Sequence, residues 1–174
     1  VFRSPKESSQ ILLDDMRKFK NRILLVHTDK KKLKTSRVLR YIEFGEKEGY
    51  NKRILKERWY DLGKRKPCNI IWIRTPYNKH CVHLNKIGLY VVDHVEITPK
   101  EDPEFYCALL NTVIYMLFRE GGIYGRSTLG LGSLKTEVMD VKQLPVIDRD
   151  KLEPQIIERI RDLFQALSRR QIGT

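Results

Sequence analysis

Length, composition and charge narrow the possible functions of the chain. Its 174 residues suffice for one domain with a hydrophobic core, and 34 Lys and Arg against 22 Asp and Glu give +12 at pH 7. This excess favours a polyanionic partner. No apolar run approaches the roughly 20 residues of a membrane-spanning helix, and three spaced cysteines give no disulfide framework. We expect a cytoplasmic location without a membrane partner and, since the chain begins at Val1, a piece of a longer protein.

Residues 1–27 are predicted to form a linker, a short helix and a buried strand. The spacing of Ile11, Leu12 and Met16 favours a helical stripe, and the apolar run of residues 22–27 favours a strand. His27 ends that strand without any partner motif. We therefore interpret it as a hydrogen-bonded structural residue and not as a catalyst.

Most of the excess positive charge lies between residues 30 and 66. Fourteen Lys and Arg against five Asp and Glu give this segment a net +9, three quarters of the total. A helix capped by Thr35 or Ser36 is predicted here, with Val38, Leu39, Ile42 and Gly45 toward the core and Arg37 and Arg40 outside.

Two aromatic residues, Trp59 and Tyr60, lie inside the basic segment. Aromatic rings flanked by cations can stack on unpaired bases or pack against sugars. Rings of this size are also common core anchors, in which case the neighbouring lysines form a solvated face. Both interpretations stay open at this point.

Four short strands are predicted over residues 69–74, 80–84, 89–92 and 94–97. Turn residues separate them, which favours an antiparallel meander. The alternative of a zinc site rests on Cys68, His80, Cys81 and His83. Alternation along a strand places Cys81 and His83 on one face and His80 on the other, and no second ligand pair follows. We therefore expect no metal here.

The clearest predicted helix spans residues 103–120. Asp102 can cap it, Pro103 suits its first turn, and Gly121 and Gly122 can end it. Apolar side chains occur nearly all round this helix. We therefore expect it to lie deep in the domain.

A glycine-rich loop over residues 124–133 follows this helix. Its glycines allow close backbone approach, and Arg126, Ser127 and Thr128 can donate to phosphates or base edges. The spacing fits neither a P-loop, because Leu131 follows Gly130, nor the dinucleotide-binding fingerprint. The alternative is an ordinary surface loop.

An amphipathic strand is predicted after the loop and ends at Leu144-Pro145. It contains Glu137, Asp140 and Lys142, a grouping that also occurs at magnesium sites of nucleases. Such triplets are common in highly charged chains, so we do not favour a nuclease.

The tail, from Asp150 to about Arg170, is predicted to be a second amphipathic helix. Together these elements predict an α+β fold, in which an antiparallel or mixed sheet packs with a buried helix. We expect a recognition domain over residues 1–148. Residues 149–174 would form the C-terminal helix, packed on this domain or on a neighbouring one.

The order of these elements resembles one enzyme family. Leu109-Leu110-Asn111-Thr112, the loop GGIYGRSTLGLGS and the segment ending in Leu144-Pro145-Val146 look like the C-terminal part of adenine-specific DNA methyltransferases of the TaqI type. Residues 58–63, RWYDLG, resemble the tryptophan–tyrosine element of that family. The resemblance covers about residues 1–147 and rests on the order and spacing of the motifs.

The resemblance implies a target-recognition domain that docks against the major groove of double-stranded DNA in a restriction–modification system. It implies S-adenosylmethionine as the cofactor of the parent enzyme, bound by an N-terminal catalytic domain of the same chain. The sequence contains neither that cofactor motif nor the adjacent prolines of the catalytic tetrapeptide, so we assign it no catalytic, cofactor-binding or metal-binding residue. The implied DNA contacts are Lys30, Lys31, Lys32, Lys34, Lys52, Arg53, Arg58, Trp59, Tyr60, Lys64, Arg65, Arg126, Ser127, Thr128 and Lys135.

A second interpretation is a non-catalytic basic module that binds RNA or protein without DNA sequence specificity. Affinity for duplex DNA that depends on one sequence and falls steeply with salt would separate the two.

Overall fold

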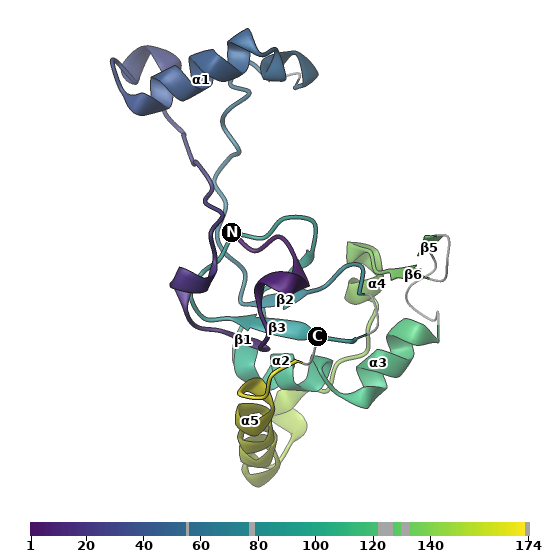
Figure 1. Cartoon of the computed structure of the whole chain (residues 1–174). Helices are drawn as coiled ribbons and strands as arrows, with labels where there is room; N and C mark the ends of the chain where they lie inside the picture. Colours follow the sequence, from purple (N-terminus) through teal and green to yellow (C-terminus); the bar gives the residue numbers. More distant parts are fainter. Residues whose placement is uncertain (55, 77–78, 122–126, 130–132, 173–174) are drawn as a thin grey trace. The chain divides into compact units, whose positions relative to one another are not determined.

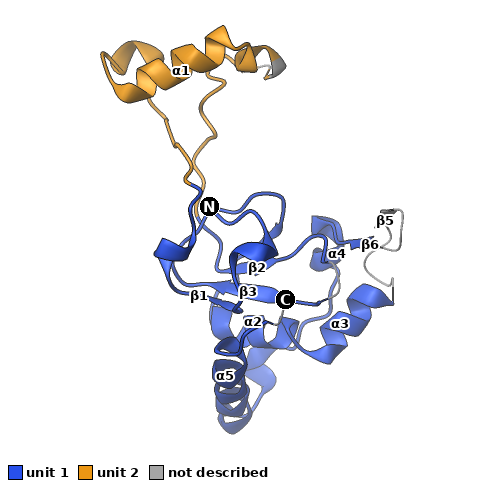
Figure 2. Cartoon of the chain, viewed as in Figure 1, with its two compact units in different colours: residues 1–21, 67–174 blue, residues 22–66 orange. Residues whose placement is uncertain are grey.

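The computed structural model describes the chain except for residues 55, 77–78, 122–126, 130–132 and 173–174 (Figure 1). Contacts divide it into two compact units (Figure 2). The first comprises residues 1–21 and 67–174, and the second comprises residues 22–66. The boundary predicted from the sequence lies at residue 148, whereas this division falls on either side of the basic segment. Among the described residues, no helix has the length and apolar character needed to cross a bilayer.

A four-stranded mixed sheet forms the framework of the first unit. Its strands are β1 (Leu12–Leu13), β2 (Ile70–Trp72), β3 (Val82–Asn85) and β4 (Val95–Ile97), in the order β1-β3-β2-β4. β2 pairs antiparallel with both β3 and β4, and β1 pairs parallel with β3. A second, two-stranded sheet joins β5 (Ser127–Leu129) to β6 (Ser133–Lys135). The predicted α+β fold with a mixed sheet is confirmed.

Each face of the four-stranded sheet has its own hydrophobic cluster. Successive side chains of a strand point to opposite faces, so Ile70 and Trp72 join one cluster while Ile71 joins the other. The first cluster contains Phe105 and its neighbours on the helix α2 (Pro103–Leu110). The second contains Phe2 and residues near the N-terminus. Both clusters consist only of residues from the first unit.

The single helix predicted over residues 103–120 is instead two helices. α2 ends at Leu110, and α3 runs from Val113 to Glu120. Between them, the Asn111 side chain accepts a hydrogen bond from the Val82 N–H at 3.0 Å and donates to the Val82 carbonyl at 2.8 Å. The expectation of a deeply buried element holds for α2. It is wrong for much of α3, since Val113 and Leu117 are exposed.

Four other predicted elements differ from the structure. Residues 22–27 form no strand, and the predicted helical stripe near Ile11 contains β1 instead. Residues 89–92 contribute only an isolated bridge between Phe2 and Val91. The strand predicted up to residue 145 stops early, because α4 (Val138–Lys142) begins after Glu137, whose N–H donates to the Asp140 carboxylate at 2.7 Å. In the four-stranded sheet β2 lies between β3 and β4, so the predicted antiparallel meander is wrong in its strand order.

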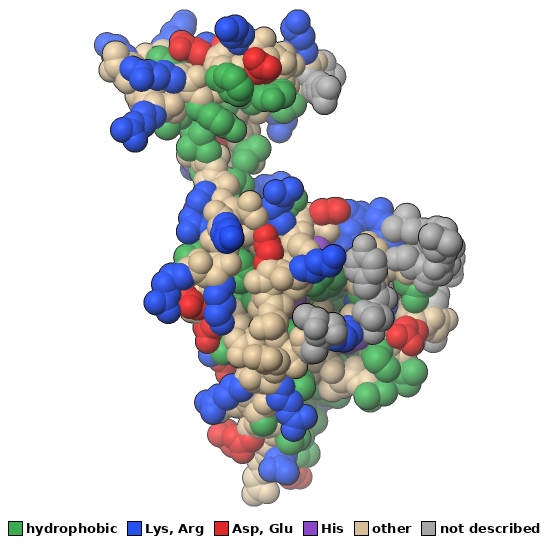
Figure 3. Space-filling view, viewed as in Figure 1, with side chains coloured by type: hydrophobic (Ala, Val, Ile, Leu, Met, Phe, Trp, Pro, Cys, Tyr) green, Lys and Arg blue, Asp and Glu red, His purple; other side chains and the backbone are tan. Residues whose placement is uncertain are grey.

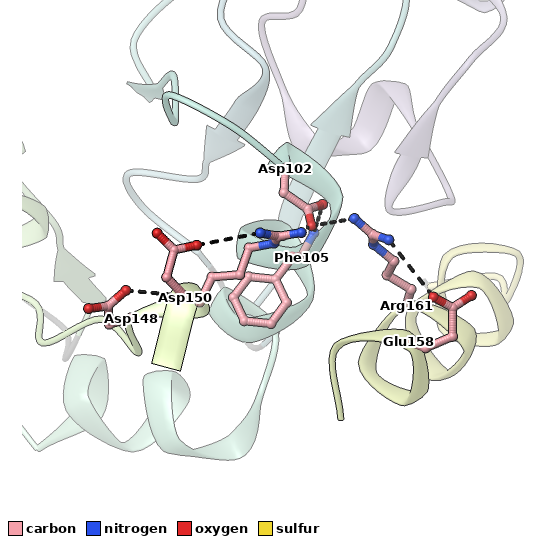
Figure 4. Close-up of polar contacts among 7 residues, drawn as sticks. Asp102, Phe105, Asp148, Asp150, Glu158 and Arg161 are labelled. Atoms are coloured by element: carbon pink, nitrogen blue, oxygen red, sulfur yellow. Dashed lines mark hydrogen bonds and ion pairs between the residues drawn. The ribbon is translucent and has the colours of Figure 1, made fainter. Parts of the chain in front are cut away.

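The predicted C-terminal helix is present as α5 (Pro154–Ser168), preceded by the 3-10 turn η5 (Arg149–Lys151). Its buried side chains Ile157 and Phe164 join the cluster beneath α2. Asp102, the N-cap of α2, lies between Arg149 at 2.9 Å and Arg161 at 2.5 Å (Figure 4). The helix therefore packs on the first unit through both apolar contacts and ion pairs.

Short 3-10 turns complete the described elements of the chain. η1 (Pro5–Glu7) and η2 (Met16–Lys18) lie in the first unit. The second unit contains η3 (Lys30–Lys32), the helix α1 (Arg37–Lys47) and η4 (Tyr50–Arg53).

Candidate nucleic-acid interface

The second compact unit carries most of the net charge of the molecule. Its 45 residues include fifteen Lys and Arg and six Asp and Glu, a net +9 out of +12. Basic and hydrophobic side chains lie next to one another on the visible face of this unit (Figure 3). The basic segment identified from the sequence, residues 30–66, thus lies within a compact unit of its own.

The unit is organised around α1 and the indole of Trp59. The Ser36 hydroxyl caps α1 by accepting a hydrogen bond from the Leu39 N–H at 3.1 Å, as predicted. Ile42 and Gly45 are the buried residues of the helix. A Cβ atom at Gly45 would lie 2.4 Å from Cη2 of Trp59, so the ring fits only because this position has no side chain.

Trp59 and Tyr60 both contribute to the fold of this unit. Their rings contact edge to face at a centroid distance of 6.2 Å, and the Tyr60 hydroxyl donates to the Thr28 carbonyl at 3.4 Å. Both side chains are half-buried. The structure therefore gives each ring an anchoring contact, which was one of the two roles considered from the sequence, and leaves part of its surface accessible.

Asp61 holds the two ends of the unit together. Its carboxylate lies 2.9 Å from Nδ1 of His27 and accepts the Gly63 N–H at 2.9 Å. The hydrogen bond with His27, followed by that of Gly63, lowers the pKa of Asp61. Arg58 adds an ion pair to Asp61 at 3.6 Å and donates to the His27 carbonyl at 3.1 Å. The expected structural hydrogen bond of His27 is confirmed.

The predicted basic contacts fall into three groups. Lys30 is paired with Glu46 at 2.5 Å, and Arg58 is engaged as described. Exposed side chains make up the second group, namely Lys31, Lys32, Lys34, Lys52, Lys64 and Arg65. For Arg53 only the backbone is described, as the last residue of η4. Of these exposed side chains, Lys31, Lys32, Lys34, Lys52 and Lys64 are available to neutralise phosphates.

The remaining predicted contacts belong to the first unit. Arg126 lies outside the described residues. Ser127 and Thr128 belong to β5, where their backbones pair with Lys135 and Leu134 of β6. The Lys135 ammonium lies 2.7 Å from the Glu137 carboxylate, which also pairs with Arg74. The structure therefore places Lys135 in a charge network of its own unit.

The alternative zinc site finds no support among the described residues, which contain no group of three or more possible ligands. Sγ of Cys81 lies 3.6 Å from Nε2 of His83, on the shared face that strand alternation predicts. Burial lowers the pKa of His83 to about 4 and raises that of Cys81 to about 12. His80 instead contacts the Leu110 carbonyl at 2.6 Å. These side chains belong to the sheet core.

Two members of the possible nuclease triplet, Glu137 and Asp140, are likewise engaged in structural contacts. The ion pairs of Glu137 with Lys135 and with Arg74 lower the pKa of that carboxyl. The Asp140 carboxylate accepts the Glu137 N–H as described above. Their geometry is that of a helix start stabilised by charge.

Two exposed aromatic residues on α1 were not selected from the sequence. Tyr41 is 60% exposed and Phe44 is 52% exposed, whereas Ile42 and Gly45 of the same helix are buried. The available signal was their spacing relative to Arg37 and Arg40, since residues three and four apart share a helix face.

Comparison with known proteins adds no assignment. No protein-family model, curated protein or solved structure matches the chain.

Proposed function

We propose that the chain is the DNA target-recognition domain of an adenine-specific DNA methyltransferase that modifies the exocyclic amino group. The observation that carries the proposal is the compact unit of residues 22–66, with a net charge of +9. Duplex DNA presents a dense array of phosphates, and exposed lysines and arginines bind it by displacing counterions. The motif order of residues 1–147 adds the methyltransferase assignment.

The proposal divides the work between two parts of a parent enzyme. This chain would fix the position and register of the duplex, with Lys31, Lys32 and Lys34 on phosphates and Arg126 near bases or backbone. A catalytic domain of the same parent chain would bind S-adenosylmethionine and the flipped adenine. Trp59 and Tyr60 would act mainly by shaping the basic unit, because their rings anchor it.

The test is selection of bound sequences from a pool of random duplexes by the purified full chain. We expect one sequence to be enriched, and its affinity to fall with salt by a slope of about −0.9 for each phosphate contact. Charge reversal of Lys31, Lys32 and Lys34 should then weaken binding to all duplexes alike and reduce the slope.

Lys56, an exposed residue of the same unit outside the predicted contacts, supplies the matched control. Its reversal should change affinity less. Binding to RNA in preference to duplex DNA, or no enrichment of any sequence, would instead favour the interaction-module interpretation.

A further inference from the structure

One face of α1 combines aromatic and basic side chains. We call it the outer face of α1 and define it as Arg37, Arg40, Tyr41, Phe44 and Lys47, all exposed. Each of these positions lies three or four residues from another member of the set, which keeps them on one broad side of an α-helix together with the exposed Glu43. Each aromatic residue follows an arginine by four positions.

The buried residues of α1 do not belong to the outer face. α1 packs through Ile42, which is fully buried, and through Gly45, which lies against Trp59. Among the described residues, none of the three cations of the outer face forms an ion pair, in contrast to Lys30 with Glu46. Two large rings and three unpaired cations in water contribute little to stability, so a binding role explains them better than a structural one.

We propose that the outer face of α1 lies in the major groove of duplex DNA. This inference rests on the proposed function, since it names the part of the basic unit that reaches the bases. The groove is about 12 Å wide and accepts an α-helix. The eleven residues of α1 extend over about 16 Å.

The chemistry of the outer face complements that of a DNA duplex. Arg37, Arg40 and Lys47 supply positive charge along the helix, complementary to the phosphates on both sides of the groove. Tyr41 and Phe44 lie between these cations, where they meet thymine methyl groups and the apolar edges of sugars and bases.

The experiment separates the two kinds of contact by their salt dependence. In the full chain, Tyr41→Ala with Phe44→Ala removes apolar contact and no charge. We expect at least a tenfold loss of duplex affinity with an unchanged salt slope. Arg37→Gln with Arg40→Gln removes two charges and should reduce the magnitude of the slope by about 1.8. Alanine and glutamine favour helices, so α1 should form in both variants, which circular dichroism would check.

Matched controls come from exposed residues elsewhere in the same unit. Leu62→Ala removes an exposed apolar side chain, and Lys56→Gln removes an exposed charge. We expect near wild-type affinity for Leu62→Ala. Lys56→Gln should change the salt slope by less than half of the change caused by the arginine double variant. Protection of guanine N7 from dimethyl sulfate, an atom of the major groove, should be seen with the wild-type chain and lost with the aromatic double variant.

The outcomes distinguish this inference from the proposed function. A wild-type chain that selects one duplex, while the aromatic double variant binds it equally well, overturns the inference and leaves the function standing. Absence of N7 protection by the wild-type chain would likewise overturn the inference and leave the proposed function standing. A wild-type chain that does not bind duplex DNA, or binds single-stranded RNA through the outer face, overturns both.

Discussion

At the residue scale, the contact between Gly45 and Trp59 leaves no room for a side chain at position 45 of α1. Alanine would place its Cβ atom 2.4 Å and 2.8 Å from two ring carbons of the indole, so the ring or the helix must move. Alanine also favours a helix over glycine by about 1 kcal/mol. Overpacking costs about 1–3 kcal/mol, which exceeds that gain in most of its range.

We therefore predict that Gly45→Ala destabilises the unit of residues 22–66 by about 1 kcal/mol. Hydrogen exchange of the α1 amides measures this change directly. A smaller ring should relieve the overlap, so Gly45→Ala should cost less in a Trp59→Phe background than in the wild type. Equal costs in the two backgrounds would show that the indole does not set the size limit at residue 45.

At the element scale, Asn111 explains the break between α2 and α3. Its side chain pairs with both backbone groups of Val82 and also donates to the Cys107 carbonyl at 2.8 Å. These bonds satisfy peptide groups at the start of β3. The asparagine of the leucine–asparagine motif thus has a structural role that joins a helix end to the sheet.

Asn111→Ala should therefore destabilise the first unit by about 2 kcal/mol or more, because it leaves buried peptide groups without their partners. Asn111→Asp serves as the matched control: it keeps an acceptor for the Val82 N–H and loses the donor to the two carbonyls. We expect an intermediate loss in chemical denaturation. A neutral alanine variant would mean that water satisfies the same groups.

Elements with local causes could be predicted from the sequence. The cap at Ser36, the start at Pro103 and the amphipathic pattern of α5 were all found in this way. The break at Asn111 was not, because it depends on Val82, 29 positions earlier. The apolar run of residues 22–27 formed no strand because its unit offers no described strand to pair with.

The sequence predicts which segment of the candidate site is charged. It does not predict which side chains of that segment are exposed. Sequence placed the basic residues correctly in one region, yet it could not separate the paired Lys30 from the exposed Lys31. That distinction depends on Glu46, the residue before the last of α1. The exposed positions of Tyr41 and Phe44 likewise depend on which side of the helix faces Trp59.

At the scale of the whole molecule, charge and hydrophobic core are divided between the two units. Both large hydrophobic clusters lie in residues 1–21 and 67–174, which carry only +3 of the net charge. The second unit carries +9 and is held by a small set of contacts around Ile42, Trp59 and Asp61. Stability and polyanion binding should therefore be separable.

Replacing residues 22–66 by a glycine–serine linker tests this separation. The remaining chain keeps both clusters, so it should still unfold cooperatively. Trp72 becomes its single tryptophan. Because this side chain is buried in the sheet core, its fluorescence can report the unfolding transition. Affinity for a random duplex should fall strongly and lose most of its salt dependence, because the unit with three quarters of the net charge is absent. Duplex affinity equal to that of the intact chain would place the DNA-binding surface on the first unit, and loss of the Trp72 transition would show that its core needs the basic unit to fold.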